Sequence, residues 1–241
     1  MKRGYVPNQH GAWAMLILPF LLGMFAAGPA WPHAPLFAGW LLVYLFSFPL
    51  LQWIKTGNKK VYAKPAIVYG TLLVPAGIAV AALKPDLFRY APLLVPLFLI
   101  NVYYARRNRE RDLANDLAAV LLFCLMVFVA YDAGGGVDRR LAAELFALSF
   151  FYFTGTVFYV KTMIREKNNP LYYRLSVGYH LALLAAGAFW LPAGMAVPLA
   201  VLLARAVISP RAGISVKTGG ILEIAWSVMM LCAVLICYRL L

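Results

Sequence analysis

The stretch Tyr152–Glu166, YFTGTVFYVKTMIRE, changes abruptly from apolar to charged residues. Its first part, Phe153–Val160, has the composition of the last turns of a membrane-spanning helix, and no turn signal separates it from the charged part. If the helix continues, Lys161 and Arg165 have the i and i+4 spacing that places them on one helix face. We therefore expect a functional site where this helix meets the aqueous phase.

The composition around this stretch is that of a polytopic membrane protein. The chain has 241 residues, of which 63% are hydrophobic and 13% charged, and its mean hydropathy is +0.78. A span needs about 20 apolar residues. The sequence then predicts nine spans, at 12–28, 35–54, 65–83, 88–105, 113–131, 141–160, 171–190, 192–208 and 219–238. Only the neighbourhood of Pro192 divides the seventh span from the eighth, so seven or eight spans are alternatives. We predict an all-α polytopic membrane helix bundle in which residues 1–241 form a single transmembrane domain.

The distribution of basic residues predicts the orientation. With nine spans, 17 of the 22 Lys and Arg residues fall on one side and 5 on the other. By the positive-inside rule the N-terminus is cytoplasmic and the C-terminus lies outside. Topology and anionic membrane lipids then account for most of the net charge of +13, so no nucleic-acid partner is expected.

Common catalytic and metal-binding motifs are missing from the sequence. It contains no HExxH, CxxC or GxSxG pattern. His10, His33 and His180 fall at three different depths of the predicted bundle, which argues against haem or metal ligation by histidines. The three cysteines lie inside apolar runs, where we interpret them as small buried hydrophobes. We predict no metal and no cofactor.

Polar residues at membrane depth are the candidates for function, because each is costly to insert into a bilayer. Nearly all of them fall in the predicted cytoplasmic half; His180 and Glu144 are the exceptions. This pattern predicts a cavity that opens to the cytoplasm and binds a phosphate or carboxylate headgroup through basic residues at its mouth. The candidate substrate-binding residues are Gln52, Lys55, Asn101, Tyr104, Arg106, Thr156, Tyr159, Lys161, Arg165 and Arg205. The candidate catalytic residues are His10, Asp116, Glu166 and Glu223.

Three classes of function are compatible with such a cavity. In an enzyme, Arg165, Lys161 and Arg106 would neutralise a leaving phosphate. In a transporter, the same cluster would form the substrate gate. In a lipid-binding or scaffold protein, basic residues would extend to the membrane surface, and Asp116 and Glu223 would pair with Arg106 or Arg205 only to satisfy one another.

Three segments carry a resemblance to a known family: PNQHGAWAMLILPFLLG at 7–23, FTGTVFYVKTMIRE at 153–166 and KTGGILEI at 217–224. Together they resemble the YwiC-like family of small bacterial polytopic membrane proteins, over essentially the whole chain. The resemblance implies a multi-pass protein of the bacterial cytoplasmic membrane. It implies no particular reaction.

The layout is more distantly similar to intramembrane prenyltransferases of the UbiA type. That similarity implies a nine-helix bundle around a lipid-facing cavity, with long cytoplasmic loops after spans 2 and 6 and an isoprenoid diphosphate as ligand. Enzymes of this type bind Mg²⁺ through aspartate-rich motifs in those loops. Here the first position reads QWIKTGNKKVYAKP (Gln52–Pro65), with no acid, and the second reads KTMIREKNNPLYYR (Lys161–Arg174), where Glu166 is the only carboxylate. We therefore expect direct binding of an isoprenoid or lipid phosphate without magnesium.

Overall fold

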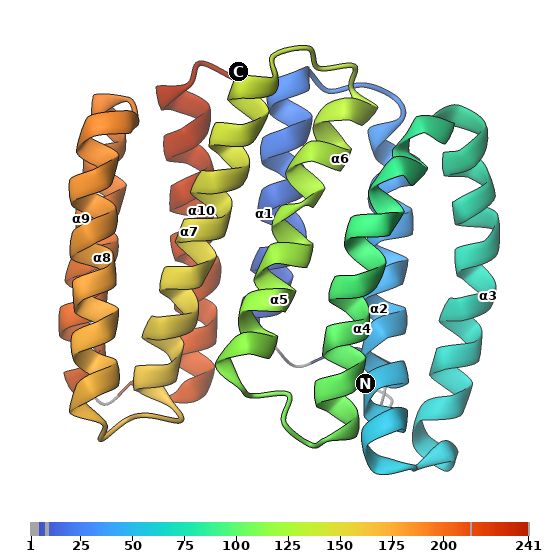
Figure 1. Ribbon diagram of the computed structural model, residues 1–241, viewed down its shortest axis with the longest axis horizontal. Coiled ribbons are helices and arrows are strands. Elements are labelled where there is room, and N and C mark those ends of the chain that lie inside the picture. The colour runs from blue at the N-terminus through green and yellow to red at the C-terminus, as the bar shows by residue number, and fades with distance from the viewer. Residues whose placement is uncertain (1–4, 8–9, 213, 241) are drawn as a thin grey trace. The chain divides into compact units, whose positions relative to one another are not determined.

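A computed structural model describes residues 5–7, 10–212 and 214–240, except for the side chains of His10 and Val216. Every regular element in this part of the chain is helical (Figure 1). The elements are α1 (His10–Ala27), α2 (His33–Thr56), α3 (Lys59–Leu83), η1 (Pro85–Tyr90), α4 (Ala91–Arg106), α5 (Leu113–Cys124), α6 (Met126–Ala133), α7 (Arg139–Met163), α8 (Pro170–Trp190), η2 (Ala193–Met195), α9 (Ala196–Ile208), η3 (Ser209–Arg211) and α10 (Val216–Cys237). The predicted all-α polytopic helix bundle is confirmed.

Each predicted span corresponds to one helical segment of the described chain. Seven segments are long and apolar enough to cross a membrane. Of the remaining two, α1 is apolar but shorter, with its apolar part at Gly11–Ala27, and α8 is less apolar. The first half of α8 carries Tyr172, Tyr173, Arg174, Tyr179 and His180. The predicted division near Pro192 is confirmed, because α8 ends at Trp190 and Leu191 is extended.

The residue contacts group into two compact units, which we describe separately. Unit 1 comprises Met1–Asn8 and Pro19–Phe146, and unit 2 comprises Gln9–Leu18 and Ala147–Leu241. In unit 1, α2 packs along α3, and α4 packs along α5. In unit 2, α8 packs along α9, and α10 contacts α9. The single transmembrane domain stays a prediction.

The connection between α2 and α3 is much shorter than the sequence predicts. Gly57 ends α2 in the left-handed conformation, with φ of 67°, and its N–H donates to Trp53 O at 2.8 Å. The Asn58 side chain then accepts from Val61 N at 3.3 Å and caps α3. The lysines at 55, 59, 60 and 64 therefore belong to the two helices and not to a long loop. The expected long loop after span 2 is wrong, because glycine and asparagine allow an abrupt reversal.

The end of α7 also differs from the expectation for Lys161 and Arg165. The helix ends at Met163, and Glu166 N–H donates back to Lys161 O at 2.7 Å. Arg165 therefore lies in the turn after α7 and does not share a helix face with Lys161. After six intervening residues the chain re-enters a helix, since Asn169 accepts from Leu171 N and caps α8, with proline at the first helical position.

An aspartate at the end of α6 ties several elements of unit 1 together. The side chain of Asp132 is only 5% exposed, and it accepts hydrogen bonds from Arg89, Tyr90 and Arg139. These donors lie in η1 and at the start of α7. Charge-assisted hydrogen bonds from several donors fix this end of the unit.

Candidate functional site

A buried ion pair between α9 and α10 is the centre of the candidate site in unit 2. Arg205 Nη1 lies 2.9 Å from both carboxylate oxygens of Glu223. The exposed fractions of the two side chains are 0% and 4%. A charge removed so completely from water is tolerated only with a partner. The two residues therefore depend on each other inside the helix bundle.

His180 in α8 contributes an acceptor to the same guanidinium. Its Nδ1 lies 2.7 Å from the Ser176 carbonyl oxygen, which can only accept, so Nδ1 carries a proton and donates. The other ring nitrogen, Nε2, lies 3.4 Å from Arg205 Nη2. A nitrogen that faces an arginine N–H must present its lone pair. The arrangement therefore assigns a neutral imidazole to His180.

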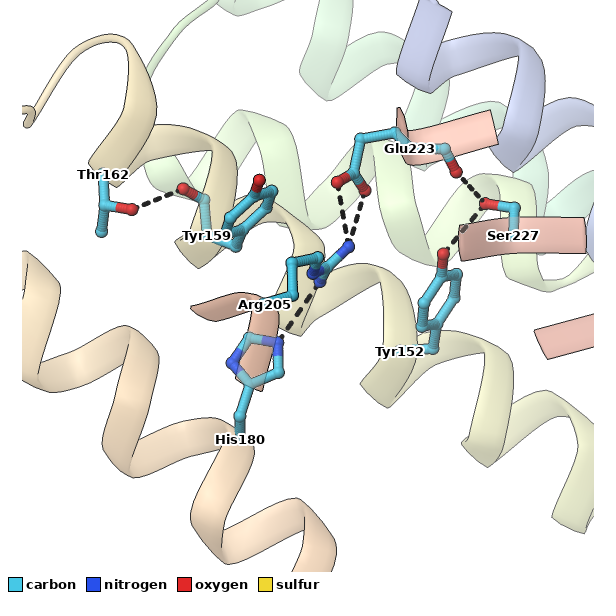
Figure 2. A network of polar contacts seen from close by, with 7 residues as sticks. All are labelled: Tyr152, Tyr159, Thr162, His180, Arg205, Glu223 and Ser227. Carbon is cyan, nitrogen blue, oxygen red and sulfur yellow. Dashed lines mark hydrogen bonds and ion pairs between the residues drawn. The ribbon is translucent and has the colours of Figure 1, made fainter. Parts of the chain in front are cut away.

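Helix α7 adds two tyrosines around the ion pair, as Figure 2 shows. The ring of Tyr159 covers the guanidinium of Arg205, with Cζ 4.2 Å from the ring centre, which is a cation–π contact. The Ser227 hydroxyl donates to the Glu223 carbonyl oxygen at 2.8 Å. Its single proton is then used, so the Tyr152 hydroxyl donates to Ser227 Oγ at 2.9 Å. These bonds fix α10 against α7 beside the carboxylate.

A glycine in the opening sequence motif allows α8 to approach. A Cβ atom at Gly155 would lie 3.1 Å from His180 Nε2 and 3.1 Å from Tyr179 Cε1. Such distances are tighter than most Cβ contacts, so a larger residue would displace the imidazole. Gly155 is therefore the reason that His180 reaches Arg205.

The guanidinium is left with unused hydrogen-bonding capacity. Among the described residues, none accepts a hydrogen bond from Arg205 Nε, and Nη2 has only the 3.4 Å contact with His180. Arginine has five N–H donors in a planar fork. The unused donors of this buried guanidinium favour a further anion.

Several residues predicted for the site lie in this network. Arg205, Tyr159 and Glu223 meet there. Thr156 lies on the same face of α7 as Tyr152 and next to Glu223 of α10. The pairing of Glu223 with Arg205 is the one that the scaffold interpretation anticipated. The other predicted residues of this region have their own positions: Arg165 is exposed in the turn, Lys161 is buried near the end of α7, and Glu166 accepts from Asn169 Nδ2 at 2.9 Å.

The predicted residues of unit 1 have other surroundings. Lys55 pairs with Glu110, and Asn101 Nδ2 donates to Leu97 O at 2.8 Å. Arg106 is exposed, and Gln52, Tyr104 and Asp116 are half-buried. The side chain of His10 lies outside the described residues. A shared cavity for these residues and those of unit 2 stays a prediction.

The ion pair with Lys55 changes the pKa of Glu110, which lies in the connection between α4 and α5. Partial burial raises the pKa of its carboxyl, but the hydrogen bond and charge of Lys55 outweigh burial, so the pKa is lowered below its ordinary value. The pair joins the end of α2 to this connection.

Sequence reasoning missed three members of the network: Tyr152, His180 and Ser227. Tyr152 and Tyr159 are seven residues apart, which is about two helical turns, and Glu223 and Ser227 have i and i+4 spacing. These spacings are visible in the sequence. His180 is one of the two polar residues that fall outside the predicted cytoplasmic half. Only the packing of α8 on α9 places it beside Arg205.

Comparison with known proteins supports the resemblance found in the sequence. The profile of the YwiC-like protein family matches residues 6–131. The chain is 43% identical to the uncharacterized protein YwiC of Bacillus subtilis over 181 residues, which cover 75% of this chain and 76% of that protein. It is 33% identical to an uncharacterized protein of Haemophilus influenzae, over 91% of this chain and 92% of that protein. No solved structure matches the chain. The profile and both relatives show that this chain belongs to the YwiC-like family.

Proposed function

We propose that this membrane protein binds an amphipathic anion, a lipid or isoprenoid phosphate, through Arg205 of unit 2. The observation that carries the proposal is the buried guanidinium, whose Nε has no acceptor among the described residues and whose Nη2 has only a long contact. A phosphate presents several oxygen acceptors and a negative charge, which match a planar fork of N–H donors. An ion pair with a purely structural role would not require guanidinium N–H groups that bind no acceptor in the protein.

The surroundings of Arg205 suit a ligand with a hydrocarbon chain. Leu175, Ile208 and Ile221 lie near the same ends of α8, α9 and α10 and are 47%, 63% and 52% exposed. Exposed apolar side chains on membrane helices face lipid. A ligand chain can therefore stay in lipid while its headgroup reaches toward the arginine.

The orientation of the protein forms part of the proposal. We place the N-terminus in the cytoplasm and the C-terminus outside the bacterial cytoplasmic membrane, because 17 of 22 basic residues then fall on the cytoplasmic side. Arg205 lies close to the end of α9 that this orientation directs to the cytoplasm. An anionic headgroup would then enter from the cytoplasmic leaflet.

Direct binding to the purified protein in a mild detergent tests the proposal. Three probes separate the sources of the phosphate: farnesyl phosphate, dioctanoyl phosphatidylglycerol and inorganic phosphate. We expect binding of one or both amphiphiles at micromolar concentration and no binding of inorganic phosphate. A charge-assisted hydrogen bond contributes about 1.5–3 kcal/mol, so loss of the arginine weakens binding at least tenfold.

The variants are chosen to separate binding from folding. In the double variant Arg205→Met, Glu223→Leu, both charges are removed, so no buried charge is left unpaired. Arg174→Ala removes an exposed arginine of α8 and is the matched control. We expect loss of binding in the double variant and normal binding in the control. Equal binding by all three proteins would refute the assignment of Arg205, and no binding of any amphiphile by the unaltered protein would refute the function.

A further inference from the structure

Glu223 shares the guanidinium of Arg205 with any anion that binds there. Both of its oxygens contact the same atom, Arg205 Nη1, at 2.9 Å. A phosphate that binds the free Nε and Nη2 donors brings a second anion to the same buried guanidinium, and repulsion between the two anions weakens the contact of Glu223 with Nη1. Glu223 is part of the protein and therefore competes with the ligand for the guanidinium of Arg205.

A displaced Glu223 would be left in an apolar environment. Its side chain is only 4% exposed, and an unpaired carboxylate at that degree of burial is strongly unfavourable. A proton from water converts it to a neutral carboxylic acid, with no other bond made or broken. The charges of the site then balance as before: the ligand supplies the negative charge beside Arg205 that the carboxylate supplied.

The groups around Glu223 leave it as the proton acceptor. From α7, Tyr159 faces Arg205 with its ring and Tyr152 donates to Ser227, and from α8, His180 faces Arg205. A proton on His180 Nε2 would place a second cation 3.4 Å from the guanidinium.

Further titratable groups lie on the neighbouring elements. Lys161 on α7 is buried, and Lys217 on α10 is exposed. In the segment of α1 that belongs to unit 2, His10 is the titratable residue, and its side chain lies outside the described part of the chain. Neither lysine takes up a proton when already charged, so the carboxylate is the site of uptake.

We infer that binding of an anionic amphiphile at Arg205 is coupled to the uptake of one proton by Glu223. This inference rests on the proposed function and adds its regulation: acid strengthens binding. Where free Glu223 is ionised and displaced Glu223 is protonated, each fall of one pH unit strengthens binding about tenfold.

Isothermal titration calorimetry measures the proton directly. Dioctanoyl phosphatidylglycerol is the probe, because its phosphodiester keeps one negative charge between about pH 5 and pH 8. Titration in two buffers with different ionisation enthalpies gives the number of protons taken up per ligand bound. We expect close to one proton for the unaltered protein, and dissociation constants that fall about tenfold per pH unit toward acid.

The variant Glu223→Gln removes the acceptor of the proton. We expect it to bind more tightly than the unaltered protein at neutral pH, because a neutral amide competes less well for Arg205, with no proton uptake and no dependence on pH. Glu223→Asp keeps the carboxylate and should keep the proton uptake. It is the variant to measure if Glu223→Gln does not fold.

The outcomes separate the inference from the function on which it rests. Binding by the unaltered protein without proton uptake, at the same affinity across the pH range, would overturn the coupling and leave the ligand site standing. Uptake that persists in Glu223→Gln would also overturn it. If the unaltered protein binds neither the diester nor farnesyl phosphate, the proposed function itself fails.

Discussion

A double-mutant cycle on Arg205 and Glu223 tests the central feature of unit 2. Arg205→Met leaves a carboxylate that is 4% exposed without its cation, and Glu223→Leu leaves a guanidinium that is 0% exposed without its anion. Removal of one partner of a buried pair costs about 3–5 kcal/mol, whereas replacement of both by apolar residues is often neutral. The double variant also loses the contact with Tyr159, which is about 1–2 kcal/mol. We expect two unstable single variants and a double variant within about 2 kcal/mol of the unaltered protein.

The free energy of unfolding can be measured in mixed micelles by titration with SDS, with fluorescence of the six tryptophans as the signal. Arg140 and Glu144 in α7 provide a control cycle, because this i and i+4 pair, at 3.0 Å, is largely exposed. Its coupling energy should be about 0.3–0.5 kcal/mol. If each single change at Arg205 and Glu223 costs under about 1 kcal/mol, or the double change equals their sum within about 0.5 kcal/mol, the pair is not energetically coupled as described.

Three further predictions concern packing, pH and topology. Gly155→Ala should lower the free energy of unfolding by about 1–3 kcal/mol, because a Cβ atom there lies 3.1 Å from the imidazole of α8; Gly178→Ala, with nothing within 4 Å, is the control and should not destabilise. Glu110→Gln should cost about 1 kcal/mol or less at neutral pH. Since the pKa of Glu110 is lowered, this difference should persist above about pH 5 and vanish as the pH falls through the folded-state pKa, so a difference that grows toward acid would contradict it. With the native cysteines replaced, cysteine at Lys59 should react with an impermeant maleimide from the cytoplasm and cysteine at Asp138 from outside; the reverse pattern would invert the proposed topology.

The composition of the chain was sufficient to predict the helices. A backbone in lipid must satisfy its hydrogen bonds internally, so apolar runs of spanning length become helices. The predicted span 141–160 lies within α7, and the turn near Pro192 separates α8 from α9. The same reasoning failed at Gly57, where the expected loop is an abrupt reversal between two helices. Hydropathy reports where polar residues begin and says little about where a helix ends.

The polarity of Glu223, Arg205 and Tyr159 was also enough to mark them as candidates, because polar groups at membrane depth stand out against an apolar background. The sequence did not predict which residues these side chains contact. Lys161 and Arg165, which spacing placed on one face, are separated by the end of α7, whereas His180, which seemed displaced in depth, contacts Arg205.

The class of fold, the approximate bounds of the helices and the polar residues that need partners can therefore be predicted from the sequence. The partners of these polar residues follow from the packing of the helices. The physical reason is that lipid and protein interior are both apolar, so the pattern of hydrophobic residues does not mark the buried face of a membrane helix. The packing of α8 and α10 on α9 brings His180 and Glu223 to Arg205, and Gly155 leaves room for the imidazole.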